Sequence, residues 1–236
     1  MTKKSLKTIK LILINSITIT RLIGSLILPF VYYKYGASLV SLFIIILFLT
    51  DAIDGFLARK LKCSTFFGSI LDACSDKLLN AISFIILSLE YTIMLAPLII
   101  EISIMYTIYS TYRYGGNVQA SRIGKNKTII LDIFVILSFI IMSLPLFKTN
   151  SIIVKHLINN SYIYITSFGF IILIACLIAL FDYLRKNTYA RLNPKSEEIK
   201  VEHKKKKSTK LLFKQLFDTN YYSKHKDESI MRQFYV

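Results

Sequence analysis

Residues 51–76 read DAIDGFLARKLKCSTFFGSILDACSD, and they contain four of the 14 acidic residues of the chain: Asp51, Asp54, Asp72 and Asp76. The stretch lies where two apolar segments meet, at residues 38–60 and 68–90. Each segment is long enough for a helix to cross the hydrocarbon core of a bilayer, which is roughly 30 Å thick. A central aspartate in such a helix costs about 2.5–3.5 kcal/mol, so carboxylates at such positions usually serve a function.

The rest of the chain has the composition of a membrane protein. Of its 236 residues, 54% are hydrophobic and 19% are charged, and charge is sparse from about residue 11 to 183 and dense after Lys186. Hydropathy predicts six spans, at residues 11–33, 38–60, 68–90, 91–113, 128–147 and 161–185. We therefore predict an all-α integral membrane fold with six transmembrane helices. These form one domain over residues 11–185, between an N-terminal segment at 1–10 and a basic tail at 186–236.

The basic residues predict the orientation of the spans. They gather before the first span, after the second, between the fourth and fifth, and in the tail, whereas the opposite side has only Lys34, Lys148 and Lys155. By the positive-inside rule, both termini lie in the cytoplasm, on the inner face of the cell membrane. The net charge of +16 does not indicate a nucleic-acid partner, because these residues flank apolar runs and no nucleic-acid motif accompanies them. We expect them to face anionic membrane lipids instead.

The tail leaves two interpretations open. Four consecutive lysines at 204–207 precede apolar side chains at Leu211, Leu212, Phe213, Leu216 and Phe217. These apolar residues could form a short amphipathic face that lies on anionic lipid. Alternatively, the tail is solvated and partly disordered.

The spacing of the four aspartates places them on two helix faces. At about 100° per residue, Asp51, Asp54, Gly55 and Ala58 fall within about 100° of arc, with Arg59 beside them. On the next helix, Gly68, Asp72 and Asp76 are spaced by four and form one stripe. Because the connection at 60–67 is short, the two helices should be antiparallel neighbours, with their acidic faces converging near the cytoplasmic surface.

Four carboxylates at one point repel one another unless cations lie between them. Oxygen ligands without histidine or cysteine favour Mg²⁺ or Mn²⁺, and two such ions about 3.5–4 Å apart suit displacement at phosphorus. The small Gly55, Ala58 and Gly68 would let a bulky ligand approach, and Arg59 suits a diphosphate. The alternatives are a polar seam between two helices or a bare cation site in a transporter, although transporters usually place their acids near the bilayer midplane.

The same residues resemble the signature of the CDP-alcohol phosphatidyltransferases, and the resemblance covers about residues 8–185. They read Asp51-x2-Asp54-Gly55-x2-Ala58-Arg59-x8-Gly68-x3-Asp72-x3-Asp76. The resemblance implies a homodimer of six-helix membrane cores whose active site opens to the cytoplasm. It also implies transfer of a phosphatidyl group from CDP-diacylglycerol to an alcohol, with release of CMP.

The resemblance assigns a role to each residue of the signature. Asp51, Asp54 and Asp72 correspond to metal ligands, and Asp76 to both a ligand and the base that accepts the hydroxyl proton. The remaining signature positions correspond to those lining the CDP moiety: Gly55, Ala58, Arg59 and Gly68.

Three further segments are similar to those of bacterial phosphatidylglycerophosphate synthases. They are Asn15-x2-Thr18-x2-Arg21, Asp72-x3-Asp76-Lys77-Leu78-Leu79, and residues 120–128, which read ASRIGKNKT. This similarity implies glycerol 3-phosphate as the acceptor alcohol. Arg113, Lys125 and Lys127 would then bind its phosphate, unless the two lysines are ordinary positive-inside residues.

Three departures from the family pattern keep other acceptors open. The usual glutamine after Thr128 is missing, Ala73 stands where proline is common, and the basic tail is longer than expected. The acceptor could instead be phosphatidylglycerol, as in a cardiolipin synthase, or inositol phosphate or serine. A buried Arg21 needs an anionic partner. Glu101 and Asp132 also lie in or near spans, and either could pair with Arg21 or Arg113.

Overall fold

The computed structural model describes residues 3–61, 65–114, 121–147, 151–193 and 208–225. Within these ranges, the side chains of residues 3–10, 12–14, 51–61 and 112 lie outside the description. The described residues are helical and contain no strand, which confirms the predicted all-α class.

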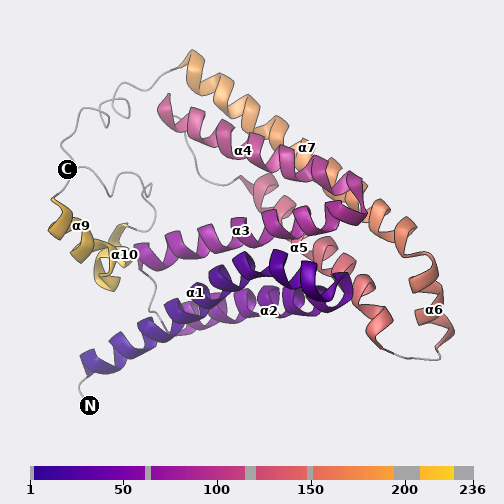
Figure 1. The fold of residues 1–236 in the computed structure, drawn as a ribbon. Helices are drawn as coiled ribbons and strands as arrows, with labels where there is room; N and C mark the ends of the chain where they lie inside the picture. Colours follow the sequence, from indigo (N-terminus) through magenta and orange to yellow (C-terminus); the bar gives the residue numbers. More distant parts are fainter. Residues whose placement is uncertain (1–2, 62–64, 115–120, 148–150, 194–207, 226–236) are drawn as a thin grey trace. The chain divides into compact units, whose positions relative to one another are not determined.

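The helices follow one another along the chain as Figure 1 shows. The long ones are α1 (Lys3–Tyr35), α2 (Ala37–Leu61), α3 (Phe66–Glu90), α4 (Leu95–Arg113), α5 (Arg122–Ser143) and α7 (Ser161–Leu192). The short ones are η1 (Thr92–Met94), η2 (Leu144–Leu146), α6 (Ile152–Asn159), α9 (Thr209–Leu216) and α10 (Thr219–His225). Gly36 connects α1 to α2 with a φ of 80°, a conformation that glycine adopts at little cost.

Four of the described helical segments are long and apolar enough to cross a membrane: Asn15–Tyr35, Thr92–Thr111, Arg122–Leu146 and Ser161–Leu192. They correspond to the first, fourth, fifth and sixth predicted spans. In the described part of α2, the apolar segment is shorter, at Ala37–Thr50. The second and third predicted spans, which contain the aspartates, are not confirmed as spans by this measure. The four segments agree with an integral membrane protein.

The chain divides into two compact units, and the division falls within α1, α2 and α3. The first unit comprises residues 1–26, 46–79 and 201–236, and the second comprises residues 27–45 and 80–200. Each unit has its own packing and is described by itself.

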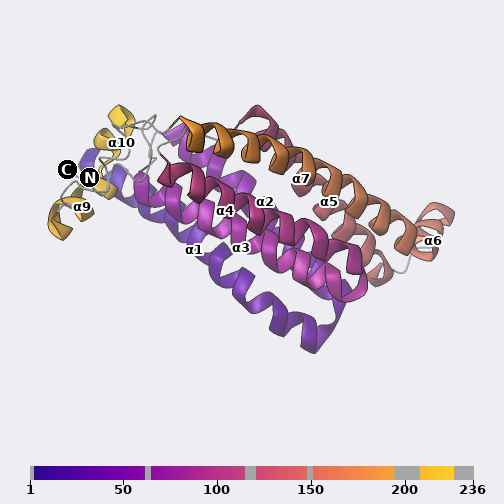
Figure 2. The same cartoon turned by 90° about the horizontal axis from the view of Figure 1, so that it is seen from above.

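In the second unit, α7 packs along both α4 and α5 (Figure 2). The buried face of α7 recurs every three or four residues: Ile165, Gly169, Ile172, Cys176, Ala179, Tyr183, Asn187 and Ala190. Small residues in this stripe allow the helices to approach closely, as membrane helices commonly do. Large apolar side chains such as Phe170 and Phe181 are 52% and 73% exposed on the rest of α7, as expected of a surface that faces lipid.

In the first unit, α1 approaches α2 at a glycine and holds α3 through polar contacts. A Cβ atom at Gly24 would lie 3.0 Å from Leu47 Cδ2, so any larger residue at position 24 would press against α2. The Ser75 hydroxyl of α3 donates a hydrogen bond of 3.2 Å to the Thr18 carbonyl oxygen of α1. These contacts bring α1 against the acidic end of α3.

Close packing at Gly169 predicts a test of the contact between α7 and η1. A Cβ atom at Gly169 would lie 2.8 Å from Ile93 Cγ2, so Gly169→Leu should overpack this contact and destabilise the fold by about 1–3 kcal/mol. Thermal unfolding in detergent measures the effect. Ser167→Leu introduces the same side chain at an exposed position of α7 and serves as the matched control. Equal melting temperatures for the two variants would contradict the packing argument.

Candidate active site

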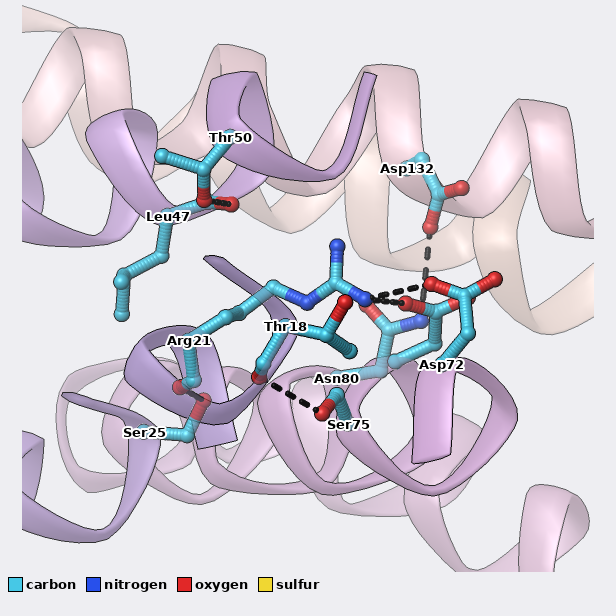
Figure 3. Close-up of polar contacts among 10 residues, drawn as sticks. Thr18, Arg21, Ser25, Leu47, Thr50, Asp72, Ser75, Asn80 and Asp132 are labelled. Carbon is cyan, nitrogen blue, oxygen red and sulfur yellow. Dashed lines mark hydrogen bonds and ion pairs between the residues drawn. The ribbon is translucent and has the colours of Figure 1, made fainter. Parts of the chain in front are cut away.

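Arg21 of α1 forms ion pairs with two carboxylates of α3. Its Nη2 atom donates a hydrogen bond to Asp72 Oδ1 at 2.7 Å and lies 3.1 Å from Asp76 Oδ1. Figure 3 shows the guanidinium group reaching towards Asp72. The Arg21 side chain is fully buried, whereas the side chains of Asp72 and Asp76 are 45% and 40% exposed. One cation therefore contacts two anions that lie one helical turn apart.

Local structure at the start of α3 positions these carboxylates. Thr65 caps the helix, because its Oγ1 atom accepts a hydrogen bond of 3.1 Å from the Gly68 backbone N–H. A Cβ atom at Gly68 would lie 3.1 Å from Asn15 Oδ1, so glycine here lets the Asn15 side chain approach α3. One side of α1, with Asn15, Thr18 and Arg21, therefore lies against the side of α3 that contains Gly68, Ser75 and the two aspartates. The role of Gly68 at a nucleotide stays a prediction.

The burial of Arg21 explains why the two aspartates stay together. A guanidinium inside a membrane span requires anionic partners, and Asp72 and Asp76 supply them. Two carboxylates at positions i and i+4 repel each other, and a cation between them offsets that repulsion. Because the carboxylates remain partly exposed, a ligand can also reach them.

The chemistry of Asp72 and Asp76 fits the predicted divalent cation. Carboxylate oxygens suit Mg²⁺ or Mn²⁺, and this pair projects from one side of a helix. Among the side chains that the structure describes, no three His, Cys, Asp or Glu residues gather into a metal site. The remaining signature residues lie in α2 with side chains outside the described set: Asp51, Asp54, Gly55, Ala58 and Arg59. The four-carboxylate site therefore stays a prediction, and α3 contributes the half that is described.

The residues predicted to bind the acceptor phosphate differ in exposure. Arg113 ends α4 and Lys125 lies in the first turn of α5, and both are exposed. Lys127 is buried, and its Nζ atom forms an ion pair with Glu101 of α4. A phosphate could bind Lys127 only if that pair opened, whereas Arg113 and Lys125 are accessible as they stand.

The second unit also contains polar contacts that the sequence analysis did not assign. The Cys176 thiol lies 3.7 Å from the Glu101 carboxylate as a weak donor. Arg191 donates a hydrogen bond of 3.1 Å to Ser110 Oγ, which in turn donates to Asn187 Oδ1 at 3.3 Å. Cys176, Glu101 and Ser110 can be recognised in advance as isolated polar positions in predicted spans. Asn187 and Arg191 were predicted to lie in the tail, but α7 continues to Leu192 and includes them. The partners cannot be recognised in advance, because they depend on how the helices rotate.

The sequence predicted that Arg21 has an anionic partner but did not predict which one. Glu101 pairs with Lys127, and Asp132 accepts a hydrogen bond of 3.4 Å from Asn80. The described partners of Arg21 are instead the signature residues Asp72 and Asp76. Arg21 was expected to need an anion, but its place beside the predicted catalytic carboxylate emerges only from the structure.

Comparison with known proteins identifies the class to which this site belongs. Residues 11–180 match the family described as CDP-alcohol phosphatidyltransferase. The chain therefore belongs to the CDP-alcohol phosphatidyltransferase family, as the signature predicted, and the members of this family are enzymes.

Three curated relatives share the name CDP-diacylglycerol--glycerol-3-phosphate 3-phosphatidyltransferase. The protein from Pectobacterium atrosepticum is 34% identical over 43% of this chain and 58% of its own length. Those from Wigglesworthia glossinidia brevipalpis and Pseudomonas fluorescens are 44% and 41% identical over 33% of this chain, and over 46% and 41% of their own lengths. The chain thus spans about half the length of these relatives. No solved structure matches it significantly.

The ion pairs predict a specific effect of replacing Arg21. Arg21→Gln should destabilise the fold by more than the roughly 1 kcal/mol of an exposed pair, but by less than the 3–5 kcal/mol of a fully buried one. The reason is that the arginine is buried but the carboxylates are partly solvated. The loss should be largest in EDTA, because bound divalent cations would replace the missing positive charge.

Thermal unfolding in detergent, with EDTA or with Mg²⁺, measures both effects. Lys77→Gln removes an exposed positive charge next to Asp76 in the sequence and is the matched control. A melting temperature for Arg21→Gln equal to that of the control, under both conditions, would show that the pairs do not hold α1 to α3.

Proposed function

We propose that the chain transfers a phosphatidyl group from CDP-diacylglycerol to an alcohol, releasing CMP, as a step in phospholipid synthesis. The observation that carries this proposal is the position of Asp72 and Asp76. They lie one turn apart, partly exposed and joined to a buried Arg21, within a chain that belongs to the CDP-alcohol phosphatidyltransferase family.

Glycerol 3-phosphate is the acceptor that we favour. The name shared by three relatives supports it, and so do the exposed Arg113 and Lys125. The product would then be phosphatidylglycerophosphate. The other acceptors expected within the family are phosphatidylglycerol, inositol phosphate and serine, and CMP release measured with a panel of these alcohols separates them.

The distribution of basic residues supports the topology that we propose. Six spans, with both termini in the cytoplasm, would place the start of α3 at the inner face of the cell membrane. The aspartates would then face the cytoplasm, where CDP-diacylglycerol in the inner leaflet and a soluble acceptor meet. We further propose that the functional form is a homodimer, as the family resemblance implies.

The proposed reaction assigns a task to each side chain of the site. The acceptor hydroxyl oxygen attacks the phosphorus next to diacylglycerol, its proton passes to the Asp76 carboxylate, and the bond from phosphorus to the CMP oxygen breaks. Arg21 holds Asp76 towards the reacting groups. Asp51, Asp54, Asp72 and Asp76 would hold two Mg²⁺ or Mn²⁺ ions, which when bound neutralise negative charge on the diphosphate. Arg59 would contact the diphosphate.

The remaining signature residues shape the donor site in this proposal. Gly55, Ala58 and Gly68 would leave room for the CDP moiety, because none of them carries a side chain larger than a methyl group. Arg113 and Lys125 would bind the acceptor phosphate through charge-assisted hydrogen bonds. The apolar helix surfaces would hold the acyl chains of the donor within the bilayer.

Replacement of the proposed base tests the reaction. Asp76→Asn should lower the rate of CMP release from CDP-diacylglycerol by at least about 100-fold, a typical general-base contribution, while the protein stays folded. EDTA should abolish CMP release by the unmodified protein. Asp132→Asn exchanges the same groups on α5 and should retain turnover. Normal turnover by Asp76→Asn would refute the assignment of Asp76 as the base. Cation flux through the protein in proteoliposomes, with no release of CMP, would refute the proposed transferase activity.

Replacement of two lysines on α5 should have different effects, on substrate binding at Lys125 and on stability at Lys127. Lys125→Ala should raise the KM for glycerol 3-phosphate about 10-fold or more, because a hydrogen bond to a charged group contributes about 1.5–3 kcal/mol. It should leave the KM for CDP-diacylglycerol nearly unchanged. Lys127→Met should instead destabilise the fold by about 3–5 kcal/mol, because it leaves the Glu101 carboxylate buried without its lysine.

The double variant Glu101→Gln/Lys127→Met should recover much of that stability, since both charges are then gone. Thermal unfolding and steady-state kinetics distinguish the two roles. A normal melting temperature and a raised KM for Lys127→Met would assign Lys127 to the phosphate after all.

A further inference from the structure

Aromatic side chains hold the two tail helices at the start of α3, within the first unit. Phe217, directly after α9, stacks on Phe67 with ring centroids 4.6 Å apart. Tyr221 and Tyr222 of α10 meet the ring of Phe66 edge-on at 6.0 Å and 5.0 Å. Phe66 is only 2% exposed, so these contacts cover it well. This part of the tail is therefore ordered against α3 and has a defined outer surface.

The outer surface of α9 combines lysines with apolar side chains. At about 100° per residue, four exposed residues fall within about 160° of arc, in the order Phe213, Lys210, Lys214, Leu211. Phe213 is 61% exposed and Leu211 is 45% exposed. The residues on the other side, Leu212, Gln215 and Leu216, are less exposed. We call this set of four residues, with its two lysines between a phenylalanine and a leucine, the α9 surface.

We propose that the α9 surface binds anionic phospholipid at the membrane surface. Lys210 and Lys214 would contact the headgroups, and Phe213 and Leu211 would enter the boundary between headgroups and acyl chains. This arrangement suits lipid because lysine stems can lie along apolar groups while their ammonium groups stay at the polar interface. Anionic lipid also attracts basic residues that lie close to the membrane.

Two observations favour lipid over a soluble acidic partner. Four helical segments in the described part of the chain are long and apolar enough to cross a bilayer, so the tail is tethered beside a lipid surface. A nucleic acid or an acidic protein would use the lysines but would give no reason for a phenylalanine that is 61% exposed beside them. The α9 surface also lies beyond residues 11–180, so it does not belong to the part that defines the family.

The tail contacts also connect the α9 surface to the candidate active site. Phe66 and Phe67 lie between the Thr65 cap and Gly68, at the beginning of the stripe that leads to Asp72. A lipid-bound α9 would therefore secure the segment from which the acidic stripe starts. The binding itself does not depend on the proposed transferase activity.

The chain contains no tryptophan, which allows a direct test. Phe213→Trp introduces a single indole, and the full-length variant is placed in nanodiscs of phosphatidylcholine, with or without phosphatidylglycerol. We expect the indole emission to shift to shorter wavelength and to be quenched by brominated acyl chains only when phosphatidylglycerol is present. Raising the salt to about 1 M, where the Debye length is about 3 Å, should reverse both effects.

Charge variants in the same background identify the binding surface. Lys210→Gln/Lys214→Gln should abolish the shift and the quenching. Lys155→Gln/Lys224→Gln removes the same charge from exposed positions on α6 and α10 and should retain both effects. Three results would overturn the proposal. Quenching of the indole could be equal without phosphatidylglycerol, it could be absent in every nanodisc, or both double variants could lose it equally. A shift caused by RNA in detergent, without lipid quenching, would instead identify a nucleic-acid surface.

Discussion

A buried guanidinium that must find anions inside an apolar span is the constraint on which the described part of the site depends. Arg21 meets this requirement by contacting both Asp72 and Asp76. The contact joins α1 to α3, is reinforced by the hydrogen bond from Ser75 to the Thr18 carbonyl, and keeps two like charges close together. Stability and the proposed chemistry therefore depend on the same three side chains.

Two buried cations among the described side chains show how exposure separates a ligand site from a packing contact. Lys127 and Glu101 are both nearly inaccessible, at 5% and 10% side-chain exposure, so their charges serve each other. Arg21 is equally buried, but its carboxylate partners are 40–45% exposed and can also contact a ligand. Of the two lysines near the start of α5, Lys127 is thus buried and Lys125 is accessible, although they are only two positions apart.

Apolar length, charge and spacing in the sequence predicted much of this protein. The all-α class, four of the six spans and the family followed from them, because each depends on composition or on residues at fixed intervals. The third predicted span differs because Asp72, Asp76 and Lys77 add charge to α3, whereas the described side chains of α2 end at Thr50. The tail, for which the sequence left two interpretations, has an ordered part because Phe217 and Tyr222 find aromatic partners on α3.

The sequence by itself determined that Asp72 and Asp76 share one side of a helix, that Arg21 needs an anion, and that the chain resembles an enzyme family. Only the tertiary structure decided that Arg21 forms ion pairs with Asp72 and Asp76, and that Lys127 forms an ion pair with Glu101. The physical reason is that spacing along one helix fixes the relative directions of its own side chains. The partner of a buried charge depends instead on how neighbouring helices rotate and slide, which packing at residues such as Gly24 and Gly68 decides.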